Sequence, residues 1–321
     1  MDLRQRAVLA TITAGRRWFK DTRLVRALPL GPVVSGLLRF SHGTQETTTG
    51  FRDLELTVPA GSGTIAAGLL GGFYERLELD LFEQLCADSA VVVDVGANLG
   101  IYSCLAASRL PPEAMLVCFE PVPGNLRLLR ANLHRNAVPG QDGPAPVEVA
   151  VEPLAVGAGP GTATLHLADD IGQHRVAVDG DGTLTVPQIE LDSHLAALLT
   201  ERPHLARVDI LKIDVEGYDG HVLRGARRIL TEDRPALFIE FCVPQLARCG
   251  FTAEEFAALL AEAYDEIHII EETRARVTTC APSALLDPRY RDRLLNIVAV
   301  ARPEHLPTVR AWAGRRAVLS H

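Results

Sequence analysis

VVVDVGANLG, residues 91–100, is the stretch that decides the fold of this chain. An apolar, β-branched run reaches an acid at Asp94 and then the turn-forming residues Gly96, Asn98 and Gly100. Such a run is typical of a buried strand that enters a helix through a tight turn. Because turns of this kind bind ligands in α/β proteins, the stretch predicts a binding loop.

Further apolar runs follow, and helical segments separate most of them. The strands expected are 91–95, 115–119, 147–151, 208–213, 236–240, 266–270 and 296–300. Strands that alternate with helices predict an α/β fold, here a doubly wound, mostly parallel seven-stranded sheet with helices on both faces. In such a sheet, ligands bind at the carboxyl ends of the strands.

Composition divides the chain into two parts. We expect a helical and irregular N-terminal extension over residues 1–85 and a ligand-binding domain over 86–321. A glycine-rich region at about 152–190 interrupts the α/β alternation. We expect it to form short hairpins and loops inserted after the third strand, where they form a rim for the substrate.

The charge balance argues against a nucleic-acid partner. The chain has 32 basic and 40 acidic residues, a net charge of −8, and 5% aromatic residues. A nucleic-acid-binding surface needs a basic face and usually stacking rings. The first 26 residues are the exception, since they are basic and amphipathic and would suit peripheral contact with an anionic membrane. Packing of that segment on its own domain is the favoured alternative.

The six cysteines show no CxxC spacing. Scattered cysteines of this kind predict buried, reduced thiols, a cytoplasmic compartment and no zinc site.

Two acids flank the predicted binding loop. Asp94 stands two residues before Gly96, where it would repel the diphosphate of a nicotinamide cofactor, so a dehydrogenase is disfavoured. Glu120 ends the next strand, beside the first turn, where its carboxylate can accept both hydroxyls of a ribose. The two acids together favour a nucleoside ligand, with bare surface carboxylates as the alternative.

Further acids end two later strands. Asp214 and Glu216 follow the strand 208–213, and Glu240 ends the strand 236–240. Asp214 is placed to act as a general base or a metal ligand, or else to cap the following helix. Asp214 and Glu240 together would suit Mg²⁺, which is possible but not favoured. His221, one turn into that helix, is a weaker catalytic candidate.

These clusters together resemble the FkbM family of S-adenosylmethionine-dependent methyltransferases. The resemblance rests on DVGANLG (94–100), FEP (119–121) and LKIDVEG (211–217), and it covers about residues 72–300. It implies the class I Rossmann-like methyltransferase fold and S-adenosyl-L-methionine as the cofactor. It also implies methylation of hydroxyl oxygens, often on sugars or secondary metabolites.

The resemblance assigns roles to individual residues. Asp94 would lie near the methionine part of the cofactor, Glu120 would hold the ribose hydroxyls, and Asn125 would support the loop beside the nucleoside. The remaining residues of the cofactor loop would be Gly96, Asn98 and Gly100. This chain has Asp219 where the family commonly has Glu, so no role is carried over to that residue.

We therefore expect an O-methyltransferase that acts on a small-molecule hydroxyl of a glycoside, glycolipid or polyketide-like metabolite. Methyl transfer needs in-line alignment of oxygen, carbon and sulfur, and a base within about 3 Å of the hydroxyl proton. Asp214 is the first candidate for that base, followed by Glu240 and His221. A catalytically degenerate fold that acts as a cofactor-binding or partner scaffold is the alternative.

Overall fold

The structure is a computed structural model that describes residues 46–317, apart from 60–64, 67, 70–71, 73, 137–146, 169–173 and 178–182. The basic segment expected to contact a membrane or the domain lies outside the described residues. Within the described part of the chain, no helix is long and apolar enough to cross a membrane.

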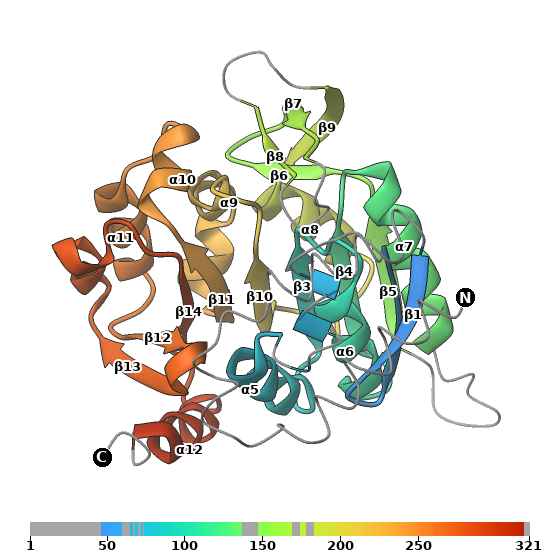
Figure 1. The fold of residues 1–321 in the computed structure, drawn as a ribbon. Coiled ribbons are helices and arrows are strands. Elements are labelled where there is room, and N and C mark those ends of the chain that lie inside the picture. Colours follow the sequence, from blue (N-terminus) through green and yellow to red (C-terminus); the bar gives the residue numbers. More distant parts are fainter. Residues whose placement is uncertain are drawn as a thin grey trace, which may run out of the picture.

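A mixed eight-stranded sheet forms the centre of the molecule, in the order β13-β12-β14-β11-β10-β3-β4-β5 (Figure 1). Its strands are β3 (Val91–Val95), β4 (Met115–Phe119), β5 (Glu148–Glu152), β10 (Ile210–Ile213), β11 (Ala236–Phe241), β12 (Ile267–Glu271), β13 (Arg276–Cys280) and β14 (Leu295–Ala299). The pairs joining β11, β10, β3, β4 and β5 are parallel, whereas β14 and β13 run antiparallel to their neighbours. The predicted α/β, mostly parallel fold is confirmed, with β13 as one strand more than expected.

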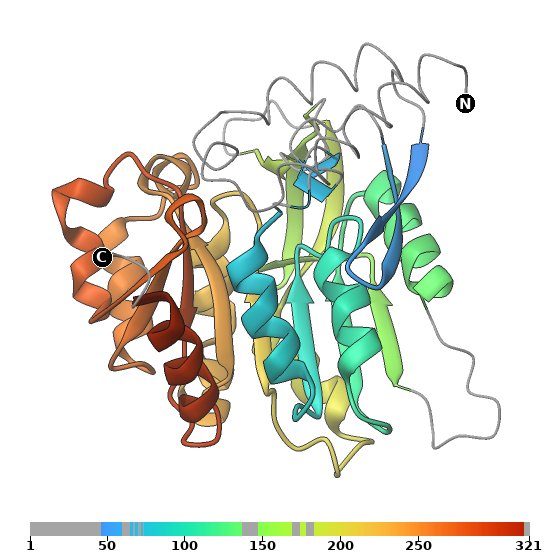
Figure 2. The same cartoon turned by 60° about the horizontal axis from the view of Figure 1, so that its bottom comes forward.

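Helices cover both faces of this sheet. One apolar core lies under α5 (Arg76–Cys86), α6 (Ile101–Arg109), α7 (Pro123–Asn136) and α12 (Leu306–Ala317), which Figure 2 shows on one side of the sheet. The other core lies under α8 (Leu191–Leu199), α9 (Asp219–Gly225), α10 (Val243–Arg248) and α11 (Ala253–Ala261). Because both faces are covered, every residue of β3 and β4 is buried, and both strands are almost entirely apolar.

The described part of the predicted extension packs on the domain. Strands β1 (Glu46–Phe51) and β2 (Leu54–Pro59) form an antiparallel hairpin, and the backbone N–H of Thr57 donates to Asn132 Oδ1 of α7 at 2.7 Å. Side chains of this hairpin and of α5 belong to the same apolar core as β3 and β4. Helix α5 runs across the predicted boundary between residues 85 and 86.

A separate four-stranded sheet occupies the glycine-rich region. It has the order β6-β9-β7-β8 and consists of β6 (Ala155–Gly157), β7 (Gly161–His166), β8 (Arg175–Val176) and β9 (Leu184–Glu190). Figure 1 shows this insert sheet above the central sheet. Its side chains Ala155, Leu165 and Val176 line the cavity described below.

Candidate active site

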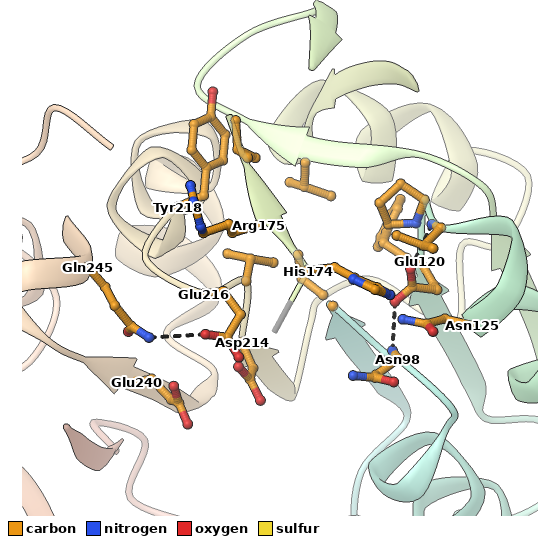
Figure 3. A pocket seen from close by; sticks show the side chains of 18 of the residues that line it. Asn98, Glu120, Asn125, His174, Arg175, Asp214, Glu216, Tyr218, Glu240 and Gln245 are labelled. Atoms are coloured by element: carbon orange, nitrogen blue, oxygen red, sulfur yellow. Dashed lines mark hydrogen bonds between the residues drawn. The ribbon is translucent and has the colours of Figure 1, made fainter. Parts of the chain in front are cut away.

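A cavity of about 720 Å³ lies at the carboxyl ends of β3, β4, β10 and β11, beneath the insert sheet (Figure 3). Its volume is within the range of small-molecule and cofactor sites. Of the sequence-predicted site residues it brings together Gly96, Asn98, Glu120, Asn125, Asp214 and Glu240. The nucleoside candidates and the catalytic candidates therefore lie in one cavity.

The loop after β3 owes its shape to its glycines. Gly96 has a φ of +84°, and a Cβ atom there would lie 2.0 Å from the carbonyl oxygen of Asp214. The backbone N–H groups of Gly96 and Ala97 both donate to the carbonyl oxygen of Phe119 at 3.0 Å. The loop is therefore pressed between the ends of β4 and β10, where a residue with a side chain would push Asp214 away.

Glu120 lies at one end of the cavity, beside Asn98 and Asn125 (Figure 3). Its carboxylate accepts the backbone N–H of Asn98 at 2.9 Å and that of Val122 at 2.7 Å. The side chain is 4% exposed, and burial raises the pKa of its carboxyl to about 7 despite these hydrogen bonds. Each oxygen still has a second lone pair, so the group can accept further hydrogen bonds from a ligand.

Asp94 and Gly100 do not line the large cavity. Asp94 is 2% exposed, accepts a hydrogen bond from Ser103 Oγ at 2.5 Å, and has its pKa raised by burial. It lies opposite Lys212 in the parallel pairing of β3 with β10. With Lys212 and Asp214 it lines a small neighbouring cavity of about 30 Å³. The structure thus places Asp94 beneath the loop.

Asp214 and Glu240 lie at the other end of the cavity (Figure 3). The ammonium of Lys212 is 3.1 Å from Asp214 Oδ2 and 4.5 Å from the centre of the Tyr102 ring. Lys212 is 4% exposed, and although burial lowers its pKa, the surrounding carboxylates, Asp214 foremost, raise it overall. Lys212 therefore stays protonated and provides the cation beside Asp214.

Glu240 holds its proton more tightly than an ordinary glutamate. Burial raises the pKa of its carboxyl well above the usual value, and the nearby Asp214 and Glu75 raise it further. Glu240 is therefore suited to keep its proton within the cavity. Among the residues that the structure describes, no group of three or more His, Cys, Asp or Glu side chains is arranged to hold a metal ion.

Glu75 is a site residue that the sequence did not indicate. It lines the cavity from the segment just before α5, and Tyr102 Oη donates to its Oε2 at 2.7 Å. Burial raises the pKa of this carboxyl to about 8, with a further contribution from Glu78. Its backbone is left-handed, with a φ of +34°. No local pattern marked this residue, because it reaches the site only through the packing of α5 on the sheet.

Asp219, which received no role from the sequence, shapes the loop after β10. Its carboxylate accepts the backbone N–H of Gly217 at 2.9 Å and that of Val215 at 3.4 Å. It is 2% exposed, and burial raises its pKa to about 6. Asp219 thus closes the loop that carries Asp214 and Glu216.

His221 does not line the cavity. Its Nε2 lies 2.8 Å from the carbonyl oxygen of Cys249, and its ring stacks on Tyr218 with 4.3 Å between the ring centres. His221 therefore packs between α9 and the end of α10, and none of these contacts supports the catalytic role predicted for it.

A doubly wound sheet with a glycine loop after β3 and an acid after β4 is typical of Rossmann-like methyltransferases. Residues 94–267, more than half of the chain, match the family model described as "Methyltransferase FkbM domain". The chain belongs to the FkbM methyltransferase family.

Characterised relatives show the same relationship. Methyltransferase 1 of Beauveria bassiana is 30% identical over 167 residues, which is 47% of this chain and 66% of the relative, so the chain spans just under two thirds of its length. The hexuronic acid methyltransferase AglP of Haloferax volcanii is 25% identical over 196 residues, which is 59% of this chain and 70% of the relative.

Solved structures are more distantly similar. Methyltransferase FkbM from Methylobacillus flagellatus is 16% identical with a TM-score of 0.39, over 73% of this chain and 54% of that chain. The O-methyltransferase TomG from Streptomyces achromogenes, in complex with SAM, is 16% identical with a TM-score of 0.39, over 71% and 80%. These similarities are too low to support an inference about function.

Proposed function

We propose that the protein is an S-adenosylmethionine-dependent O-methyltransferase that methylates a hydroxyl of a sugar or secondary metabolite in the cytoplasm. One observation carries the proposal: Glu120 and Asp214 lie at opposite ends of a single cavity. Family membership and the name of one relative, a hexuronic acid methyltransferase, also support methyl transfer to a sugar.

The residues at the β3 and β4 ends fit the nucleoside part of this cofactor. Glu120 is buried at the cavity wall, and its two oxygens retain lone pairs for the ribose hydroxyls. Gly96 lets the loop backbone approach closely, since any Cβ there would meet Asp214. When bound, the cofactor would supply a methyl group that is already activated on a sulfonium.

The protein's own contribution is to orient the acceptor and to hold protons. Asp214, whose carboxylate has Lys212 beside it at 3.1 Å, would accept the proton of the acceptor hydroxyl. Glu240, with its raised pKa, would keep its proton and donate a hydrogen bond to the acceptor. The insert sheet above the cavity would exclude water from the reacting groups.

Calorimetric titration with S-adenosylhomocysteine and S-adenosylmethionine tests this proposal. We expect binding that is unaffected by EDTA or Mg²⁺ and about 10- to 100-fold weaker in Glu120→Ala, because the hydrogen bonds between this carboxyl and the ribose hydroxyls are lost. Glu152→Ala is the matched control, since this acid ends the neighbouring strand β5 without lining the cavity. If the folded native protein binds neither compound, the proposal fails and a partner scaffold becomes the better interpretation.

A further inference from the structure

Two arginines line the cavity on the side away from Glu120. Arg175 begins β8 of the insert sheet, and Arg248 ends α10. They come from two different elements of the fold, and Figure 3 shows Arg175 beside Tyr218. Gln245, one turn before Arg248 on the same helix, also lines the cavity and donates to Glu216 at 3.0 Å.

Neither guanidinium has an acidic partner among the described residues, and neither forms a hydrogen bond with them. Elsewhere the described arginines are commonly paired. Arg109 binds Asp53 and Glu83, for example, and the buried Arg302 binds Asp209 at 2.7 Å. A guanidinium that faces a cavity without a partner has its donors available for a ligand.

Both arginines also lie near one further residue, Cys249, which follows α10. Burial and Asp219 raise the pKa of the Cys249 thiol, and both Arg248 and Arg175 oppose that rise. Both positive charges are therefore within electrostatic reach of this residue. Tyr218, which also lines the cavity, contacts the insert sheet, because its Oη donates to Gln188 Oε1 of β9 at 3.2 Å.

Several acids also line the cavity, and one of them, Glu216, is held by Gln245 at 3.0 Å. Burial raises the pKa of Glu120 to about 7 and that of Glu75 to about 8, and the pKa of Glu240 is raised well above its usual value. These carboxyls are largely or partly protonated near neutral pH. Lys212 offsets the charge of Asp214.

We propose that the acceptor carries an anionic group, a carboxylate or a phosphate, which Arg175 and Arg248 bind at the mouth of the cavity. Planar guanidinium groups suit such oxyanions because they donate two parallel hydrogen bonds. The inference rests on the proposed function, in that the anion is part of the methyl acceptor. It narrows the proposed acceptor from any hydroxyl compound to a hydroxyl compound that also carries an acidic group.

Binding of matched sugar probes tests the proposal without requiring turnover. The probes are methyl glucoside, methyl glucuronide, glucose 6-phosphate and methyl glucosaminide, titrated into the full chain with S-adenosylhomocysteine present. We expect at least one of the two anionic probes to bind about tenfold more tightly than the neutral probe. The comparison of glucuronide with phosphate distinguishes the two anions.

Variants assign the preference to the two arginines. Arg175→Gln and Arg248→Gln should each reduce this tenfold anion preference about threefold, and the double variant should abolish it. Arg130→Gln is the matched control, because this exposed arginine of α7 has no ion pair with a described residue and lies outside the cavity. It should leave the preference unchanged.

Three results would overturn the inference: no binding of either anionic probe, a preference for the cationic glucosaminide, or an anion preference that survives in the double variant. Binding of S-adenosylhomocysteine alone is measured on every variant. If it binds and the anion preference is absent, the inference fails and the proposed function survives. If it does not bind to the folded native protein, the proposed function itself fails.

Discussion

The ammonium of Lys212 lies 3.1 Å from the carboxylate of Asp214, and the ring of Tyr102 packs against the same ammonium. Tyr102 in turn donates to Glu75, so α6, β10 and the segment before α5 meet around one buried cation. This relationship joins the end of the cavity that holds Asp214 to a part of the chain that the sequence had assigned to an extension.

Removing this cation should strongly destabilise the protein. In Lys212→Met the carboxylate of Asp214 loses its ion-pair partner, and breaking a buried pair costs about 3–5 kcal/mol. Urea denaturation measures the change in the free energy of unfolding. Arg227→Gln, which removes an exposed pair with Glu262, is the control and should cost less than about 1 kcal/mol. Equal effects of the two substitutions would contradict the role of Lys212.

Asp214→Asn should abolish most turnover while leaving cofactor binding intact. The amide keeps the shape of the side chain but cannot accept the hydroxyl proton, and general-base catalysis contributes about 10²- to 10⁴-fold. The measurements are S-adenosylhomocysteine formation with an acceptor that the native protein uses, and calorimetric titration of the variant. Glu240→Gln should lose less, because its carboxyl acts in the protonated form. The reverse order would make Glu240 the base.

Gly96→Ala should disrupt the cofactor loop. The backbone has a φ of +84°, and the new Cβ would lie 2.0 Å from the Asp214 carbonyl oxygen, so the loop and β10 must separate. We expect a loss of about 1–3 kcal/mol in the free energy of unfolding and weaker S-adenosylhomocysteine binding. The comparison is Gly124→Ala in α7, where a Cβ meets no atom within 4 Å. That substitution should be neutral or slightly stabilising.

Asp219→Ala should impair both stability and turnover, since its carboxylate closes the loop that carries Asp214. Asp192 offers a matched control, because it likewise accepts two backbone N–H groups, those of Arg228 and Ile229, but lies outside the cavity. Each substitution should cost about 1–3 kcal/mol in thermal or urea denaturation. Only Asp219→Ala should also lower kcat. A fall in kcat with Asp192→Ala as well would attribute the effect to general destabilisation.

Glu120 should make stability depend on pH. Its pKa is about 7 in the folded protein against an ordinary value of 4.5, so the folded state binds more protons than the unfolded chain between these values. Protonated Glu120 therefore stabilises the folded state by about 3 kcal/mol relative to the ionised form. This stabilisation is fully present below pH 4.5 and is lost as the pH rises towards about 7.

Glu120→Gln provides the measurement, because the amide resembles the protonated carboxyl and does not titrate. In parallel urea denaturations, the free energy of unfolding of the variant should rise relative to that of the native protein as the pH increases from about 4.5 to 8. A difference between the two proteins that does not change with pH would show that Glu120 is not buried as a neutral group.

Local patterns in the sequence were sufficient for the fold and for half of the site. The apolar run 91–95 and the glycines after it predict a strand and a turn, because strand burial and positive φ angles are properties of a few consecutive residues. Glu120 and Asp214 follow from the same logic, since the ends of parallel strands share one edge of the sheet. The strand β13 was missed because its residues RVTTC form a short, half-exposed edge with no continuous apolar run.

Tertiary structure alone decided which of these side chains face the cavity. Asp94 turns beneath its loop to Ser103, and His221 binds a backbone carbonyl, although both lie in recognisable motifs. Glu75, Arg175 and Arg248 reach the cavity from segments with no motif. The sequence determined the sheet and its loops because those depend on neighbouring residues. The charges within the cavity depend on packing between elements far apart in the chain, which no local pattern records.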